Sequence, residues 1–169
     1  MRSSPRFSSL IAASGLIGMW IVGCASSGTT HRDSAPGVKL QPIQVQLNIG
    51  LPSDSDGNGY PDTIQALAYL FPKPGDSKES KLPVHAKGTF EFAMQDPAGR
   101  VIARWIFPPD VVDDAARNLA AGVGYSMYLR LSREQDVMPP MAVDIRCRFT
   151  TLEGHQVKGL GRATVRLGG

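Results

Sequence analysis

Apolar and polar residues alternate along most of the chain after residue 38, and this alternation predicts β-strands. A strand with one buried face needs an apolar residue at every second position. Residues 43–49 (IQVQLNI) follow this rule, with Ile43 and three further apolar residues on one face and amides on the other. Residues 63–71 (TIQALAYLF) are apolar on both faces. That stretch is therefore predicted to be a central strand, covered on both sides.

A hairpin is predicted next. Residues 90–94 alternate, the turn sequence 96–99 (DPAG) follows, and residues 101–107 (VIARWIF) return as a second strand. Trp105 shares one face of this second strand with Val101 and two other apolar residues, so both are predicted to lie in the core.

The second half of the chain adds further strands, over residues 125–131, 142–150 and 156–167. Within the middle one, Cys147 shares a face with valine, isoleucine and phenylalanine, while one aspartate and two arginines occupy the other face. Cys147 is therefore predicted to be a buried small apolar residue and not a reactive thiol.

One helix is predicted over residues 110–121, as a crossover between strands. Pro109 favours its start, Asp113 and Asp114 suit the positive end of its dipole, and Gly122 can end it. Valine, alanine and leucine residues at helical spacing give it one apolar stripe.

Together these elements predict a mainly β fold, an antiparallel β-sandwich of immunoglobulin-like or transthyretin-like kind with one short helix. The charged, proline-rich residues 72–88 are predicted to form a long surface loop. No internal repeat is visible, so residues 38–169 are predicted to be a single domain.

The N-terminus has the layout of a secretory signal. Arg2 and Arg6 precede an apolar run, residues 10–22, that is shorter than the roughly 20 residues of a membrane-spanning helix. The sequence Ile21-Val22-Gly23-Cys24 resembles the lipobox of bacterial lipoproteins. That resemblance implies a signal peptide over residues 1–23, a lipid such as palmitate on Cys24, and a flexible tether over residues 24–37. The alternative is an ordinary cleaved signal.

The lipobox resemblance also implies a location, the bacterial cell envelope, and favours the outer membrane because no aspartate follows Cys24. Loss of Arg2 and Arg6 with the signal lowers the net charge from +3 to +1. No basic excess then favours nucleic acid as a partner. Lipidation of Cys24 would leave Cys147 as the only free thiol; without it, the two cysteines could in principle pair.

Carboxylates gather in the stretch DSDGNGYPD. Asp54, Asp56, Asn58 and Asp62 occupy positions 1, 3, 5 and 9 of a calcium loop, with the Tyr60 carbonyl at position 7. The stretch resembles the DxDxDG loops of EF-hands and, in its Pro-Asp ending, the thrombospondin type 3 and dockerin-like variants. We therefore expect a structural Ca²⁺ held by these five residues.

Two observations leave an alternative to the calcium site open. Gln65 stands at position 12, where an EF-hand has a bidentate glutamate, and a strand follows where an EF-hand has a helix. Asn58-Gly59 is also a strong turn signal by itself. The same residues could therefore form a polar hairpin turn without an ion.

No catalytic motif is present in the sequence: it contains no GxSxG, HExxH, phosphate-binding glycine loop or CxxC. We therefore expect a non-catalytic envelope lipoprotein, a binding or structural module whose protein or glycan partner is unknown. Two alternatives stay open. The first is a subunit of an envelope machine, because the order of elements loosely resembles the transthyretin-like lipoprotein of type VI secretion. The second is a surface-attached carbohydrate-binding module or hydrolase.

Overall fold

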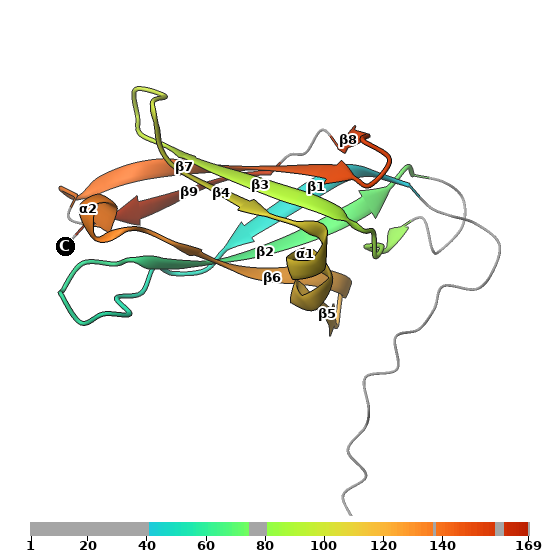
Figure 1. The fold of residues 1–169 in the computed structure, drawn as a ribbon, viewed down its shortest axis with the longest axis horizontal. Helices are drawn as coiled ribbons and strands as arrows, with labels where there is room; N and C mark the ends of the chain where they lie inside the picture. Colours follow the sequence, from blue (N-terminus) through green and yellow to red (C-terminus); the bar gives the residue numbers. More distant parts are fainter. Residues whose placement is uncertain (1–40, 75–80, 137, 158–160, 169) are drawn as a thin grey trace, which may run out of the picture. The chain divides into compact units, whose positions relative to one another are not determined.

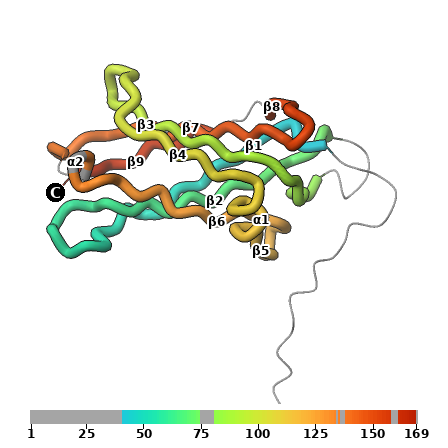
Figure 2. Tube along the Cα trace, in the orientation of Figure 1, coloured from blue at the N-terminus to red at the C-terminus, as the bar shows by residue number. Residues whose placement is uncertain are grey.

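The structure is a computed structural model, which describes residues 41–74, 81–136, 138–157 and 161–168. Cys24 and the residues predicted to form the signal peptide and the tether lie outside the described residues. Residues 38–169 form one compact unit. Two antiparallel sheets pack face to face within it, as the ribbon and the tube both show (Figures 1 and 2).

The first sheet has four strands in the order β1-β2-β6-β5. Their bounds are β1 Pro42–Ile49, β2 Thr63–Pro72, β6 Gly122–Arg130 and β5 Ala116–Leu119. β2 pairs with β1 on one side and with β6 on the other. The predicted central position of residues 63–71 is therefore confirmed.

The second sheet is built around β7, Met141–Thr151. β3 (Gly88–Gln95) pairs with β7 and with β4 (Val101–Phe107). β8 (Gln156–Val157) and β9 (Arg162–Leu167) pair with the two ends of β7 on its other side. The predicted strand 156–167 is therefore seen as two strands. The fold is a mainly β, antiparallel sandwich, as predicted.

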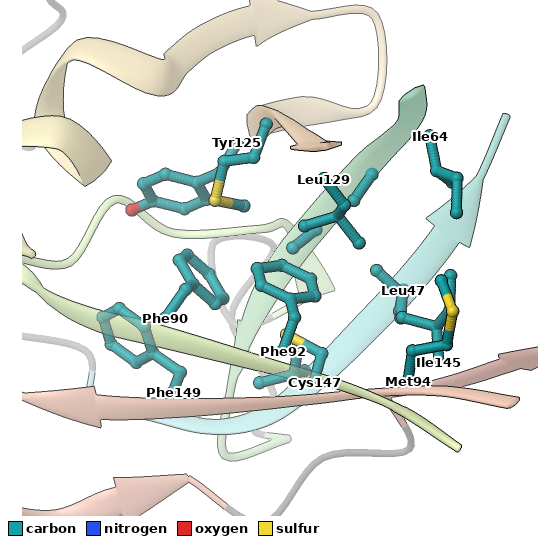
Figure 3. Close-up of a cluster of buried hydrophobic side chains, with 14 of the residues drawn as sticks. Leu47, Ile64, Phe90, Phe92, Met94, Tyr125, Leu129, Ile145, Cys147 and Phe149 are labelled. Carbon is teal, nitrogen blue, oxygen red and sulfur yellow. The ribbon is translucent and has the colours of Figure 1, made fainter. Parts of the chain in front are cut away.

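Aromatic side chains from both sheets fill the space between them (Figure 3). The ring centroids of Phe90 and Phe149 are 4.7 Å apart, and Phe90 meets Tyr125 of the opposite sheet edge-on at 5.3 Å. Phe90, Phe149 and Tyr125 are all fully buried. The inward faces of β3 and β7 are thus the apolar faces that the alternation predicts.

The predicted hairpin of β3 and β4 is confirmed. Asp96 begins its turn and is only 6% exposed. Its carboxylate accepts hydrogen bonds from the Arg100 backbone N–H at 2.9 Å and from Arg100 Nε at 2.7 Å. Gly99 takes φ 81°, a conformation that other residues rarely adopt.

The predicted helix over residues 110–121 is wrong in its second half. Helix α1 covers only Pro109–Ala115, and residues 116–119 form strand β5. Tertiary pairing decides this, because β5 completes an antiparallel ladder along the edge of β6. Gly122, with φ 116°, is the first residue of β6, directly after the turn of residues 120–121, and not a helix end.

Ile43 and Val101 were expected to face the core, yet they are 46% and 47% exposed. Ile43 lies between Pro42 and Gln44, where the pairing of β1 with β2 shifts register. Val101 pairs with Gln95 of β3, directly after the register shift between Met94 and Gln95. One extra residue in a strand shifts its neighbours to the other face. Trp105 is half-buried, and its indole Nε1 donates to the Arg130 carbonyl at 2.7 Å.

Candidate metal loop

The candidate calcium loop joins β1 to β2 and extends beyond the sheet at the end where α2 (Arg133–Asp136) lies (Figure 1). Its base is fixed by backbone hydrogen bonds. The N–H groups of Asp62 and Thr63 both donate to the Ser53 carbonyl at 3.0 Å, and Ser53 donates to Thr63 at 2.9 Å. Leu131 N–H donates to the Asp62 carbonyl at 2.7 Å. The residues between Ser53 and Asp62 are thus held on a rigid support.

Asp54 organises the first half of the loop. Its two carboxylate oxygens accept from the N–H groups of Gly57 and Gly59, each at 2.7 Å. Both glycines have positive φ, 76° and 88°, which lets the backbone curl around the carboxylate. The bond from Gly59 is the main cause that holds the pKa of Asp54 below its ordinary value.

Asp62 closes the second half. It accepts from the Ser55 hydroxyl at 2.6 Å and from the Ser55 N–H at 2.9 Å. The Thr63 hydroxyl donates in turn to the Ser55 hydroxyl at 3.2 Å. The hydrogen bond from the Ser55 side chain is the main cause that lowers the pKa of Asp62.

Asp56 is held less firmly than Asp54. It accepts from the Asn58 N–H at 3.2 Å and from the Asn58 side-chain nitrogen at 3.3 Å. Arg133 of α2 lies 3.8 Å from its carboxylate but is almost fully exposed. The Asn58 side-chain oxygen accepts from the Tyr60 N–H at 2.7 Å. Of the three loop aspartates, Asp56 therefore contributes least to the conformation of the loop.

The donor chemistry of the five predicted residues fits a hard cation such as Ca²⁺, which takes six to eight oxygen ligands. Asp54 keeps acceptor capacity beyond its two amide bonds, because an ionised carboxylate has about four lone-pair sites. The arrangement is nevertheless that of a hydrogen-bonded loop. Asp62 turns toward Ser55, and no three acidic, histidine or cysteine side chains gather as a metal cluster within the described residues. Binding would require these carboxylates to converge.

Gln65 cannot act as the twelfth ligand from where it lies. It belongs to β2, and its side-chain amide donates to the Ser126 hydroxyl on β6 at 3.1 Å. Gln65 thus differs from the EF-hand glutamate in position as well as in residue type, because its side chain lies on the outer face of the sheet.

A second polar cluster was not expected from the sequence. His85 Nε2 lies 3.0 Å from Asp113 of α1, and Lys87 lies 3.3 Å from the same carboxylate. The His85 ring stacks on Tyr125 at 6.1 Å. The Tyr125 hydroxyl donates to the Ala86 carbonyl at 3.0 Å and accepts from its N–H at 2.8 Å. The cluster fastens the segment before β3 to α1 and to the core.

Burial raises the pKa of Tyr125, a member of this cluster, to about 12. Burial would also raise the pKa of Asp113, but Lys87 and His85 together hold that pKa below its ordinary value. No sequence pattern indicates this cluster, because His85 and Lys87 precede β3 whereas Asp113 lies on α1, and only the fold brings them together.

Cys147 is buried, as predicted, and only 8% exposed. Burial raises the pKa of its thiol well above the ordinary value, so the thiolate is scarce at neutral pH. Cys24, the predicted lipidation site, lies outside the described residues.

No model of a known protein family matches the chain, and no curated protein sequence matches it either. Among the described residues, helices α1 and α2 are both too short to cross a bilayer.

Proposed function

We propose that the chain is a non-catalytic lipoprotein of the bacterial cell envelope, in which a rigid β-sandwich acts as a binding or structural module. The lipid on Cys24 provides the anchor, and residues 24–37 separate it from the folded unit. The loop that carries Asp54, Asp56, Asn58, Tyr60 and Asp62 binds a structural Ca²⁺.

The filled interior of the sandwich supports a binding or structural role. Phe90, Phe92, Phe149 and Tyr125 occupy the space between the sheets, and all four are fully buried. A ligand or partner must therefore contact loops or outer faces, where a rigid scaffold positions the recognition groups.

The single observation that carries the calcium part of the proposal is the projecting loop between β1 and β2. Its side chains offer oxygen-bearing groups at residues 54, 56, 58 and 62, and backbone hydrogen bonds tie its base to the start of β2 and to Leu131, directly after β6. Weak extracellular calcium modules work at Kd values of about 0.1–1 mM. A bound ion would offset repulsion among three carboxylates and hold the loop in one conformation for a partner.

Replacement of the lipid-bearing sulfur tests the anchor. Cys24→Ser should abolish incorporation of labelled palmitate and transfer the protein from the detergent phase to the aqueous phase. Cys147→Ser is the matched control, because it also removes one sulfur, and should leave both readouts unchanged. Equal partitioning of Cys24→Ser and the wild type would contradict the anchor.

A further inference from the structure

The outer face of the second sheet carries an arginine row. Arg104 on β4 is opposite Ala93 on β3, Ala93 is opposite Arg146 on β7, and Arg146 is opposite Arg162 on β9. All three arginines are exposed, and they lie on the side of the sheet away from the core. Strands in a sheet are about 4.8 Å apart, so the row crosses the face within roughly 15 Å.

Arg146 and Arg162 are the unusual pair in this row. Directly opposed residues of antiparallel strands have Cβ atoms only about 4.5–5.5 Å apart, and like charges there are destabilising. Asp144 of the same face pairs with Arg162 and lies close enough to Arg146 for the two charges to interact. One carboxylate balances only one of the two guanidinium groups, so the pair keeps a positive charge that an anion can neutralise.

The carboxylates that pair with arginines on this face are fewer than the arginines. Glu91 lies 3.4 Å from Arg104 and 3.9 Å from Arg148. Asp144 pairs with Arg162 and accepts from the Thr164 hydroxyl at 2.7 Å. Within the described residues, Arg146 has no carboxylate at ion-pair distance. The net charge of the face is therefore positive around Arg146.

The face is also hollowed at this place. An open depression of about 660 Å³ is lined by Arg104, Arg146, Arg148, Arg162 and Glu91, among others. Ala93 contributes to its lining in the middle of the row, and its methyl group leaves the space between the longer side chains free. A small anionic group can enter the depression and reach several guanidinium groups.

We propose that this depression binds a phosphate monoester, held chiefly by Arg146 and Arg162. The planar guanidinium donates two parallel hydrogen bonds and matches phosphate oxygens in geometry. A phosphate monoester offers three terminal oxygens and nearly two negative charges at neutral pH, enough for two facing guanidinium groups. A carboxylate offers only two oxygens and one negative charge, and this face already carries two carboxylates, those of Glu91 and Asp144. This site depends neither on the lipid anchor nor on the calcium loop.

Calorimetric titration of the mature protein, purified in a non-ionic detergent, tests the site. Glycerol 3-phosphate serves as a soluble phosphate monoester, and dihexanoyl phosphatidic acid carries the same group on a lipid. Dihexanoyl phosphatidylglycerol, a diester, and a hexaglutamate peptide complete the set of probes. At least one of the two monoesters should bind, more tightly than the diester and the peptide, and its binding should weaken as salt is added. The tighter of the two monoesters identifies whether the natural source is soluble or a lipid headgroup.

Two substitutions locate the binding. Arg146→Gln should weaken monoester binding at least about tenfold, because it removes a charged donor from the centre of the site. Arg166→Gln is the matched control: Arg166 lies on the same face of β9 but outside the depression, and its loss should change the affinity by less than about twofold. Thermal melting of both variants checks that the sandwich stays folded.

Three outcomes would overturn the proposal. The first is that neither monoester binds. The second is that Arg146→Gln and Arg166→Gln weaken monoester binding equally, so that only the general charge of the face matters. The third is that hexaglutamate binds more tightly than either monoester and that its binding is lost in Arg146→Gln. The last outcome would assign the face to an acidic protein segment instead.

Discussion

Calcium should stabilise the wild-type protein, and the effect should depend on Asp56. An ion that binds only the folded state adds RT ln(1 + [Ca²⁺]/Kd) to the free energy of unfolding, which is about 2.7 kcal/mol at a hundredfold excess over Kd. For a domain of this size, each kcal/mol raises the melting temperature by roughly 3 °C or more. Saturating calcium should thus raise the melting temperature by roughly 8 °C or more, and magnesium should raise it less.

The structure predicts different results for the two carboxylates at the start of the loop. Asp54 accepts two backbone N–H groups at 2.7 Å, so Asp54→Ala should lower the melting temperature even without calcium. Asp56 has only longer contacts with Asn58, at 3.2 and 3.3 Å. Asp56→Ala should therefore abolish the calcium effect and leave the calcium-free melting temperature unchanged or slightly higher, because repulsion in the loop falls.

Differential scanning calorimetry with and without calcium gives both quantities. Asp114→Ala is the control, because it removes an exposed carboxylate outside the loop and should keep the full calcium response. The reasoning is refuted if about 10 mM calcium, well above the weak extracellular range, leaves the wild type unchanged while Asp56→Ala is destabilising without metal. The loop would then be a hydrogen-bonded turn.

The packing and the second polar cluster give further predictions. Phe92→Ala should lower the free energy of unfolding by about 3–5 kcal/mol in urea denaturation, whereas Arg146→Ala, on the outer face of the sheet, should cost less than about 1 kcal/mol; equal costs would mean that the strand faces are wrong. Gly88→Ala should cost about 2 kcal/mol or more, because its Cβ would lie 2.2 Å from the Thr150 carbonyl oxygen, and Gly50→Ala should cost less, since its nearest contact is 3.4 Å. Asp113 has a lowered pKa in the folded state, so its contribution to the free energy of unfolding is present above its unfolded pKa and is lost as pH falls through the folded pKa. Asp113→Asn should therefore lower the free energy of unfolding at pH 7 and lower it progressively less as pH falls below about 4. A loss of stability that does not change with pH would contradict the ion-pair account.

Strands could be predicted from the sequence wherever one pattern of apolar residues continued through a whole segment. The alternation of residues 142–150 placed Cys147 correctly in the core, and the doubly apolar stretch 63–71 became the central strand β2. Both features follow from burial alone, which the order of apolar residues records directly.

Features that depend on partners distant in sequence could not be predicted. Residues 116–119 have a helical pattern but pair with the edge of β6, and a bulge turns Ile43 outward. The pair of Arg146 and Arg162 depends on the register between β7 and β9. The sequence pattern showed that Arg146 faces away from the core, but only the register shows which charge stands opposite.

The candidate metal residues could be identified from their spacing in the sequence, whereas their hydrogen bonds could not be predicted. The pattern of alternate acidic residues and glycines located the loop, and the structure adds that Asp54 binds two glycine amides while Asp62 binds Ser55. These contacts decide which carboxylate can be removed without damage, and spacing alone says nothing about them.

Mass spectrometry of the N-terminal peptide of the protein purified from its own cell envelope tests the central proposal, a lipid-anchored sandwich, most directly. The account predicts a mature chain that begins at Cys24, with the added mass of a lipid on that residue. A mature chain that begins elsewhere, or an unmodified Cys24, would contradict it.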